Sequence, residues 1–454
     1  MSSKNTQTVD MINGSLLKNT IIFAVPLMLT QFLSILFNAA DTIVVGKFAG
    51  EIALAAVGAT GSLCFLLTSL FNGLSIGSNV VIARAFGSND EERIHKAVHT
   101  AMMIAIIGGI CLAIVGFFIA RPMLQIMSTP ADIIDLSVLY MRIYFVGAIF
   151  MVIYNFGASI LRSKGDTKRP LYFLTISGVI NVVLNLIFVI PLQMSVAGVA
   201  LATAIAQLVA SVLVCRTLMN ENDATRLELN KLAIDKSIAL DIIRIGVPAG
   251  IQGMMFSLSN VVIQSSINSF DSSIIVAGNS AGANIENFVY IGMIGFMNAT
   301  ITFTSQNIGA GRLDRVKKIL WTNMWLTIVS GVLLGAGVWY FGEFLLGFYT
   351  DESIVVEVGM IRLLWVALPI ALNGILDIFV SSMRGMGYST IPTVMMLIGI
   401  CGVRLLWLWT VFPMNRTLEV IYMCFPVSWT VTSIIQGIMW LYCHHKLLKS
   451  HVNA

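Results

Sequence analysis

The chain has 454 residues, of which 57% are apolar and only 11% are charged. A soluble domain carries roughly a quarter charged residues, so a globular fold of this size could not hide so much apolar surface from water. The composition excludes a soluble enzyme, a nucleic-acid-binding protein and a disordered chain, and it predicts a polytopic membrane protein.

The chain begins with a polar segment, residues 1–18, which has neither an apolar run nor a small-residue cleavage site, so we expect no secretory signal. Apolar runs long enough to cross about 30 Å of hydrocarbon then follow one another. The alternating ten-residue segments of a transmembrane barrel are absent from the sequence. The sequence therefore predicts an all-α polytopic membrane protein with twelve transmembrane helices, at 19–46, 53–83, 97–120, 136–158, 171–191, 196–218, 245–268, 274–304, 319–341, 361–380, 391–412 and 419–442.

Positive charge is distributed unevenly between the two sets of loops. With a cytoplasmic amino terminus, most of the 27 Lys and Arg lie in inner loops, and the outer ends keep Lys47, Arg121, Arg362 and Arg416. Cytoplasmic loops of membrane proteins carry such an excess. We therefore expect a multi-pass protein of the cell inner (plasma) membrane with both termini in the cytoplasm.

Landmark residues recur at a constant offset of 222 positions along the chain. The recurring pairs are Pro26 with Pro248, Gly87 with Gly309, Arg162 with Arg384, Pro170 with Pro392 and Pro191 with Pro413. Each copy contains six predicted spans, an even number, so the two copies are parallel repeats, as in secondary transporters that alternate between two open states. The predicted domains are an N-terminal six-helix lobe (1–218), a cytoplasmic linker (219–244) and a C-terminal six-helix lobe (245–454).

Polar side chains within the spans of the first half lie at one predicted depth. Asp41 is near the outer end of the first span, Asn181 and Asn185 share a face of the fifth, and Thr203 lies in the sixth. One carboxylate among amide and hydroxyl oxygens could hold a hard cation, which would make Asp41 a metal ligand if the cation is Na⁺, or it could carry a proton. A buried hydrogen-bond cluster that packs helices is the alternative.

The second half carries its own ionisable residues. Glu286 and Arg404 are predicted at comparable depth in the eighth and eleventh spans, where they could pair with each other, or Glu286 could bind a cationic substrate. Asp377 is predicted nearer the cytoplasm, where it binds substrate or caps a polar network. Met254 and Met293, with Phe288 and Tyr290, are soft and aromatic side chains that could line a substrate cavity or simply pack helices.

At the level of motifs, the chain resembles the multidrug and toxic compound extrusion (MATE) transporters, and specifically the bacterial branch with a first-helix aspartate. The first span reads VPLMLTQFLSILFNAADTIVVGKFAG from Val25, and the segments that carry the rest of the resemblance are GLSIGSNVVIARAFGSND, ILRSKGDTKRP, SQNIGAGRLDRVKK and SMRGMGYSTIP. The resemblance covers nearly the whole chain. It implies a V-shaped transporter, not an enzyme, that exports cationic or amphipathic drugs and other toxic compounds by antiport.

The resemblance also implies site residues. The family's ion site would fall on Asp41, Asn155, Asn181, Asn185 and Thr203, although this branch usually has an aspartate where this chain has Asn185. The family implies no cofactor beyond H⁺ or Na⁺ as coupling ion, and partners limited to small-molecule substrates and membrane lipids, with no nucleic acid and a monomeric state.

A coupling mechanism follows from these residues. Neutralising Asp41 would allow the first helix to bend near Pro26, because proline concentrates bending at one helical turn. The alternative function is a flippase for lipid-linked precursors, since flippases of the same superfamily share this architecture. Gly46-Lys47 lacks the flanking residues of a phosphate-binding loop, so transport driven by ATP on this chain is excluded.

Overall fold

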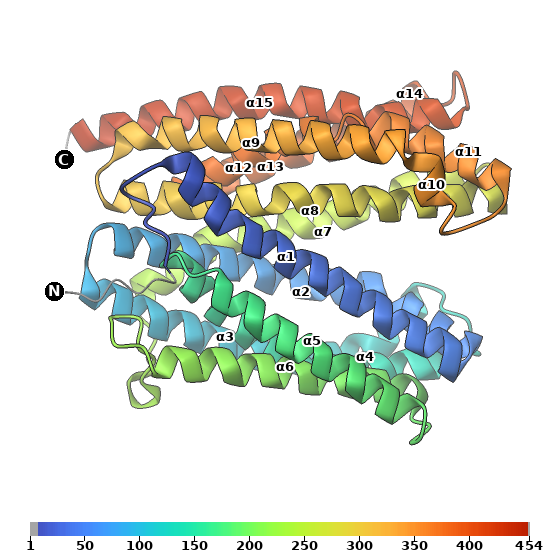
Figure 1. Ribbon diagram of the computed structural model, residues 1–454, viewed down its shortest axis with the longest axis horizontal. Coiled ribbons are helices and arrows are strands. Elements are labelled where there is room, and N and C mark those ends of the chain that lie inside the picture. The colour runs from blue at the N-terminus through green and yellow to red at the C-terminus, as the bar shows by residue number, and fades with distance from the viewer. Residues whose placement is uncertain (1–7, 453–454) are drawn as a thin grey trace. The chain divides into compact units, whose positions relative to one another are not determined.

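The computed structural model describes residues 8–452, with side chains as far as Lys449, and all its regular elements in this range are helices (Figure 1). Twelve helices are long and apolar enough to cross a membrane, which confirms the predicted number. They are α1 (Leu16–Val44), α2 (Glu51–Gly87), α3 (Glu91–Ile126), α4 (Ile134–Ser163), α5 (Lys168–Val189), α6 (Ser195–Met219), α7 (Lys236–Asn268), α8 (Ser273–Gly309), α9 (Leu313–Tyr340), α11 with α12 (Ser353–Arg362 and Ala371–Gly385), α13 with α14 (Thr390–Met396 and Val403–Thr410) and α15 (Leu418–Val452). Two short elements lie outside the spans, the 3₁₀ turn η2 (Leu229–Lys231) and α10 (Gly342–Leu346).

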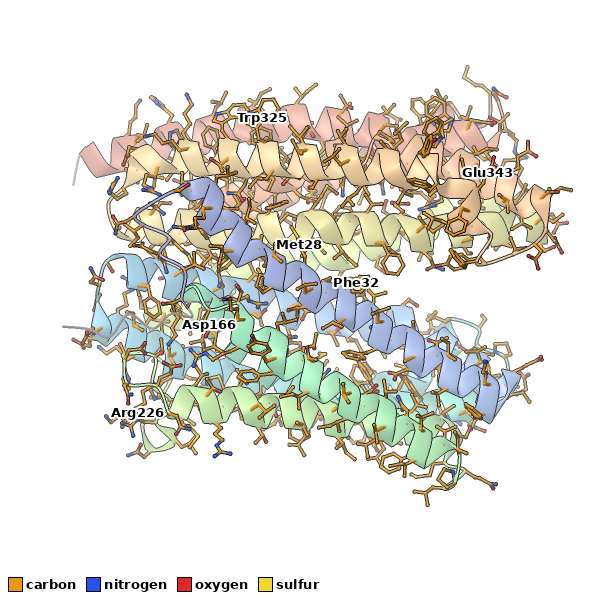
Figure 2. All side chains as sticks on the ribbon, in the orientation of Figure 1. Met28, Phe32, Asp166, Arg226, Trp325 and Glu343 are labelled. Carbon is orange, nitrogen blue, oxygen red and sulfur yellow. The ribbon has the colours of Figure 1, made fainter. Side chains whose placement is uncertain are left out.

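The spans expose apolar side chains along their lengths. Phe118 on α3 is 69% exposed and Trp325 on α9 is 65% exposed, and Figure 2 shows the latter pointing away from its helix. Such surfaces would be unfavourable in water but are well solvated by lipid tails. The surface chemistry therefore agrees with the membrane location that composition predicts.

The chain forms two compact units, one containing residues 29–251 and the other residues 10–28 with 252–452. Their boundaries lie inside α1 and α7, whereas the predicted lobe boundaries lie at 218 and 245. Residues 236–244 of the predicted linker are the first turns of α7. The opening segments of α1 and α7 are therefore each packed in a unit that contains most of the other sequence repeat.

In the first unit α4 is the central helix, because α2, α3 and α6 all pack against it, and α5 packs on α6. The beginning of α7 lies against α2 with almost no side chain between the two backbones. A Cβ atom added at Gly250 would lie 2.7 Å from Leu70 Cα and 3.1 Å from Ser69 O. Glycine is required here because any larger residue would force the two helices apart.

In the second unit α8 and α12 pack against each other and α9 packs against both, while α11 packs against α8 and α15 against α12. The beginning of α1 completes this unit. The ring of Phe23 meets that of Phe303 on α8 edge to face, with centroids 5.5 Å apart, and both side chains are fully buried. The core of this unit therefore needs residues from the first repeat.

Three π-helical turns interrupt the spans: η1 (Val45–Ala49) ends α1, η3 (Leu363–Ala367) follows α11, and η4 (Leu397–Gly402) joins α13 to α14. The tenth span is longer than predicted, because it runs from Ser353 to Gly385 instead of 361–380. The prediction that Arg362 lies at an outer end of a span is therefore wrong. Arg362 is the tenth residue of the span, next to a π-helical turn, and is 8% exposed.

Candidate functional site

Asp41 lies in the last turn of α1, where the sequence predicted an acid within the membrane. The side-chain amide of Asn185 on α5 donates a hydrogen bond to the Asp41 carboxylate. The same amide also donates to Asn181 Oδ1, one helical turn earlier on α5, at 3.2 Å. The i, i+4 spacing read from the sequence thus places both amides on the face of α5 that meets α1.

Thr203 on α6 completes the group. Its hydroxyl oxygen accepts a hydrogen bond from Asn181 Nδ2 at 3.3 Å, and its side chain also interacts with the Asp41 carboxylate. Asn185 is completely buried and Asn181 is 5% exposed. The structure therefore brings together four of the five predicted ion-site residues from three helices.

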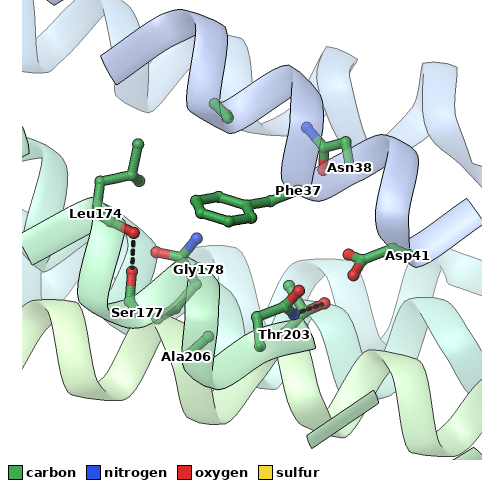
Figure 3. Close-up of a pocket in the computed structure, with 11 residues that line it drawn as sticks. Phe37, Asn38, Asp41, Leu174, Ser177, Gly178, Thr203 and Ala206 are labelled. Carbon is green, nitrogen blue, oxygen red and sulfur yellow. Dashed lines mark hydrogen bonds between the residues drawn. The ribbon is translucent and has the colours of Figure 1, made fainter. Parts of the chain in front are cut away.

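A cavity of about 70 Å³ lies beside the carboxylate in the first unit (Figure 3). Phe37 of α1 extends across it toward Gly178 of α5, where a side chain would overlap the ring. Asp41 and Thr203 lie at its wall. The cavity is large enough to hold water, because about 10–15 Å³ of such space accommodates one molecule.

Sequence reasoning missed four polar residues of this cavity. They are Ser34 and Asn38 on α1, Ser177 on α5 and Gln207 on α6. Each is three, four or seven residues from a predicted site residue on the same helix, so helical periodicity extended from Asp41, Asn181 and Thr203 would have found them.

The donor set of this group determines what it can bind. One carboxylate lies among amide and hydroxyl oxygens, and Asn185 Oδ1 and Gln207 Oε1 are buried without a hydrogen-bond partner. Hard cations and protons are bound by such oxygens, whereas structural Zn²⁺ sites are built from thiolates and imidazoles. Among the described residues, no three His, Cys, Asp or Glu side chains are close enough to hold a metal ion.

Asn155 lies elsewhere, although the family resemblance assigned it to the ion site. Its amide on α4 donates to Asn72 Oδ1 on α2 at 2.9 Å. That bond links two helices that already pack together, and it leaves Asn155 outside the hydrogen-bonded group around Asp41.

In the second unit, Glu286 of α8 is paired with Arg362. The guanidinium donates to Glu286 Oε2 from Nη2 at 2.7 Å and from Nε at 3.1 Å, and Nη1 donates to Asn279 Oδ1 at 2.6 Å. Tyr422 donates its hydroxyl to the same amide oxygen at 3.0 Å. Every nitrogen of Arg362 therefore has an acceptor, which makes its burial tolerable.

Arg404 is close to this group but does not bind the carboxylate. Its Nε donates to Ser428 Oγ at 3.2 Å, and its Cζ lies 4.3 Å from the centroid of the Phe425 ring. The predicted pair between Glu286 and Arg404 is therefore wrong. The physical reason is that Arg362, which had been placed at the membrane surface, reaches Glu286 from inside the tenth span.

The remaining predicted residues do not belong to the Glu286–Arg362 group. Asp377 is 5% exposed and accepts a hydrogen bond from Tyr290 at 3.1 Å, so these two share one buried polar contact. Met293 is completely buried against Gly331 and Gly374, as expected for packing between helices. Phe288 is 37% exposed and Met254 is half-buried.

Comparison with known proteins follows the same division into repeats. A family model described as MatE matches residues 26–187 and again residues 248–410. The two matches start 222 residues apart, the offset of the internal repeat.

Among curated proteins, this chain is 30% identical over 393 residues to the "Probable multidrug resistance protein YoeA" of Bacillus subtilis, covering 84% of each chain. It is 26% identical over 327 residues to a "FAD transporter" of Shewanella oneidensis, covering 71% of this chain and 72% of that protein.

Two solved structures share the fold. A multidrug resistance MATE family transporter of the MOP superfamily in an outward-facing conformation matches with a TM-score of 0.91 at 20% identity, covering 98% of this chain and all of that chain. A MOP superfamily transporter from Pyrococcus furiosus also matches with a TM-score of 0.91 at 20% identity, covering 98% of this chain and 99% of that one.

Proposed function

Because this chain belongs to the MatE family of membrane transporters, we propose that it is a secondary active efflux transporter that exchanges H⁺ or Na⁺ for cationic or amphipathic organic compounds by alternating access. The relative named as a probable multidrug resistance protein supports drug export. The proposal also includes a cell inner membrane location, cytoplasmic termini and a monomeric state, which rest on the distribution of Lys and Arg and on the family.

The observation that carries the proposal is the environment of Asp41. Its carboxylate meets an amide of α5 and a hydroxyl of α6 beside a small cavity, so one acid is held by three helices. Adding a proton or a monovalent cation cancels a buried negative charge and changes which of these hydrogen bonds are favourable. If the two conformations of the transporter make different hydrogen bonds here, they bind the ion with different affinities. A difference in ion affinity between two conformations is the minimum that coupled transport requires.

α1 provides a route from this acid to the rest of the protein. Pro26 and Asp41 are on the same helix, and that helix begins in one compact unit and ends in the other. Proline lacks a backbone N–H, so helix bending concentrates near it. We propose that neutralisation of Asp41 bends α1 near Pro26 and closes the substrate path, so that ion and substrate exchange.

The proposed substrate path involves the second-half residues Asp377, Tyr290, Phe288 and Met254 together with Glu286, Arg404 and Met293. Among the described residues Asp377 forms no ion pair and accepts a hydrogen bond from the Tyr290 hydroxyl, with Arg384 near enough to act on it electrostatically, whereas Glu286 is bound by Arg362. Asp377 is therefore the candidate that would attract the cationic group of a substrate.

The test is ethidium transport into inverted membrane vesicles with a proton gradient or a sodium gradient imposed separately. We expect uptake with one of the two gradients, and loss of that uptake in Asp41→Asn, which keeps the shape of the side chain but removes its charge. Asn155→Asp is the matched control, because it adds an acid outside the Asp41 group. Unchanged gradient-driven transport by Asp41→Asn would reject the coupling role.

A further inference from the structure

Buried charge in the second unit is not balanced. Arg362 and Arg404 both lie over the Phe425 ring, with Cζ atoms 5.6 Å and 4.3 Å from its centroid, and they are 8% and 3% exposed. The one carboxylate of this group, that of Glu286, is bound by Arg362. Within the described residues Arg404 forms no ion pair, and its contacts are a neutral hydroxyl and an aromatic ring. The cluster therefore carries one positive charge in excess.

An excess charge at membrane depth is unfavourable unless something compensates it. Buried charges in proteins are paired, and ionisable residues inside membrane spans mark ligand or ion pathways. The Phe425 ring offers part of the compensation, because a ring face attracts a cation. A hydroxyl and a ring do not cancel a full charge, so the cluster would gain most from an anion.

The helices that carry the two arginines are both irregular. Arg362 directly precedes the π-helical turn η3, and Arg404 is the second residue after η4. π-Helical turns are rare and occur frequently at functional sites, because they break the regular hydrogen-bond ladder of the helix. The presence of two π-helical turns beside two buried arginines indicates a functional role for this region in addition to helix packing.

Comparison with the first half of the internal repeat shows whether the fold itself needs the charges of Glu286, Arg362 and Arg404. At the offset of 222, the positions of Glu286, Arg362 and Arg404 correspond to Cys64, Tyr140 and Val182 in the first half. None of these three is a cation or a carboxylate. A six-helix repeat of this fold therefore forms without these charges, which argues for a role in ligand binding.

The polar residues of the first-half site are likewise not repeated in the second half. The first-half residues Asp41 and Asn185 correspond to Ile263 and Trp407 in the second half. The two halves thus carry different chemistry at non-equivalent positions, an acid among neutral oxygens in one and an excess guanidinium in the other.

We infer that the Glu286–Arg362–Arg404 cluster binds an oxyanion group, a carboxylate or a phosphate, of an amphipathic organic substrate, with Arg404 as its charge partner. Arg362 is held in place by Glu286 and Asn279, while Arg404 has a planar fork suited to an oxyanion. The Glu286 side chain is 17% exposed and that of Arg362 is 10% exposed. The inference rests on the proposed function and narrows its substrates to amphipathic compounds that carry an oxyanion, zwitterions included.

The experiment compares two probes that differ only in the oxyanion. Norfloxacin carries a carboxylate and an ammonium group, and norfloxacin ethyl ester keeps the ring system and the ammonium but lacks the carboxylate. Binding of each to the purified full-length protein in detergent is measured by calorimetry. We expect the wild type to prefer norfloxacin by about tenfold or more, the magnitude typical of a charge-assisted hydrogen bond.

Two substitutions at Ser428, which have the same size and differ only in charge, test whether Arg404 binds the carboxylate of the probe. Ser428→Asp places an internal carboxylate against Arg404, so the preference for norfloxacin should fall to less than about twofold. Ser428→Asn has the same shape without the charge and should keep the preference. Because the aspartate compensates a buried cation, Ser428→Asp is also expected to fold, which a thermal melt would verify.

Arginine variants give an independent measure. Arg404→Gln should weaken norfloxacin binding about tenfold and change ester binding less than about twofold. Arg142→Gln is the matched control, because Arg142 also lies over a phenylalanine ring, 4.8 Å from the centroid of Phe117, but belongs to the first unit. It should change neither affinity.

Several results would overturn the assignment. Equal affinity of the wild type for the two probes would do so, as would equal loss of both probes in Arg404→Gln. Saturable binding of sodium phosphate with no preference between the probes would assign the cluster to a small inorganic anion instead. Gradient-driven transport is measured separately, so absence of transport with a retained norfloxacin preference would reject the proposed function and leave the oxyanion site standing.

Discussion

Asn185 of α5 donates a side-chain hydrogen bond to the carboxylate of Asp41 on α1, 144 positions away in the sequence. This bond ties the acid of the first half to a helix that it meets only in the folded protein. It also places the neutral amide of Asn185 directly against the Asp41 carboxylate. Replacing Asn185 by aspartate would exchange the amide nitrogen for an oxygen and put two acids in contact.

Asn185→Asp should make the first unit bind a cation more tightly. Two carboxylates in contact repel each other, and a shared proton or sodium ion relieves that repulsion. We expect NaCl, compared with choline chloride at equal ionic strength, to raise the melting temperature of this variant more than that of the wild type. The double variant Asp41→Asn/Asn185→Asp restores a single acid and should return to the wild-type response. An identical sodium effect in all three proteins would contradict the prediction.

The pair between Glu286 and Arg362 should show strong thermodynamic coupling. Arg362→Gln leaves the Glu286 carboxylate half-buried without its cation, and breaking a buried pair in this way costs about 3–5 kcal/mol. Adding Glu286→Gln removes the unpaired charge and should recover a large part of that loss. The four free energies of unfolding, measured by chemical denaturation in detergent, give the coupling energy. Additive effects of the two substitutions would show that the pair does not stabilise the fold.

Substitution of Gly250 by alanine should destabilise the contact between α2 and α7. The added Cβ would lie 2.7 Å from Leu70 Cα, so a backbone must move, and overpacking of this kind costs about 1–3 kcal/mol. The matched control is Gly58→Ala on α2, where nothing lies within 4 Å of the added atom. Alanine favours a helix over glycine, so the control should be neutral or slightly stabilising. Equal melting temperatures of the two variants would contradict the tight contact.

Asp223 should stabilise the first unit at neutral pH and cease to do so in acid. Burial opposes its charge, but the hydrogen bonds from Thr225 and the charge of Lys164, whose Nζ is 3.1 Å away, hold the pKa of Asp223 below its ordinary value of 3.8. A carboxyl with a lowered folded-state pKa contributes stability above its unfolded pKa, and that stability is lost as the pH falls through the folded value.

The corresponding variant is Asp223→Asn. Because the Asp223 side chain is 48% exposed, solvent screening limits the expected loss at pH 7 to about 0.5–1 kcal/mol. The difference in melting temperature from the wild type should shrink as the pH is lowered from 6 to 3. Asp132→Asn, an exposed acid between α3 and α4, is the control. A difference that stays constant or grows toward pH 3 would refute the linkage.

The sequence alone determined the number of spans, the internal repeat and the polar partners of Asp41 on α5 and α6. These features are local, since the bilayer fixes the length of an apolar run and the helical period fixes which side chains share a face. The i, i+4 spacing of Asn181 and Asn185 is enough to predict that they act together. Ser34, Asn38 and Gln207 could have been found by the same rule.

Only the tertiary structure decided which side chains meet between helices. From the sequence, Arg404 was one of two possible partners for Glu286, a cationic substrate being the other, but Arg362 occupies that position because the tenth span starts at Ser353 and includes a π-helical turn. Asn155 is on the predicted helix and yet pairs with Asn72. Hydropathy sets whether a segment enters the membrane, but the rotation and depth of each helix come from packing against its neighbours, and a shift of one residue turns a side chain by about 100°.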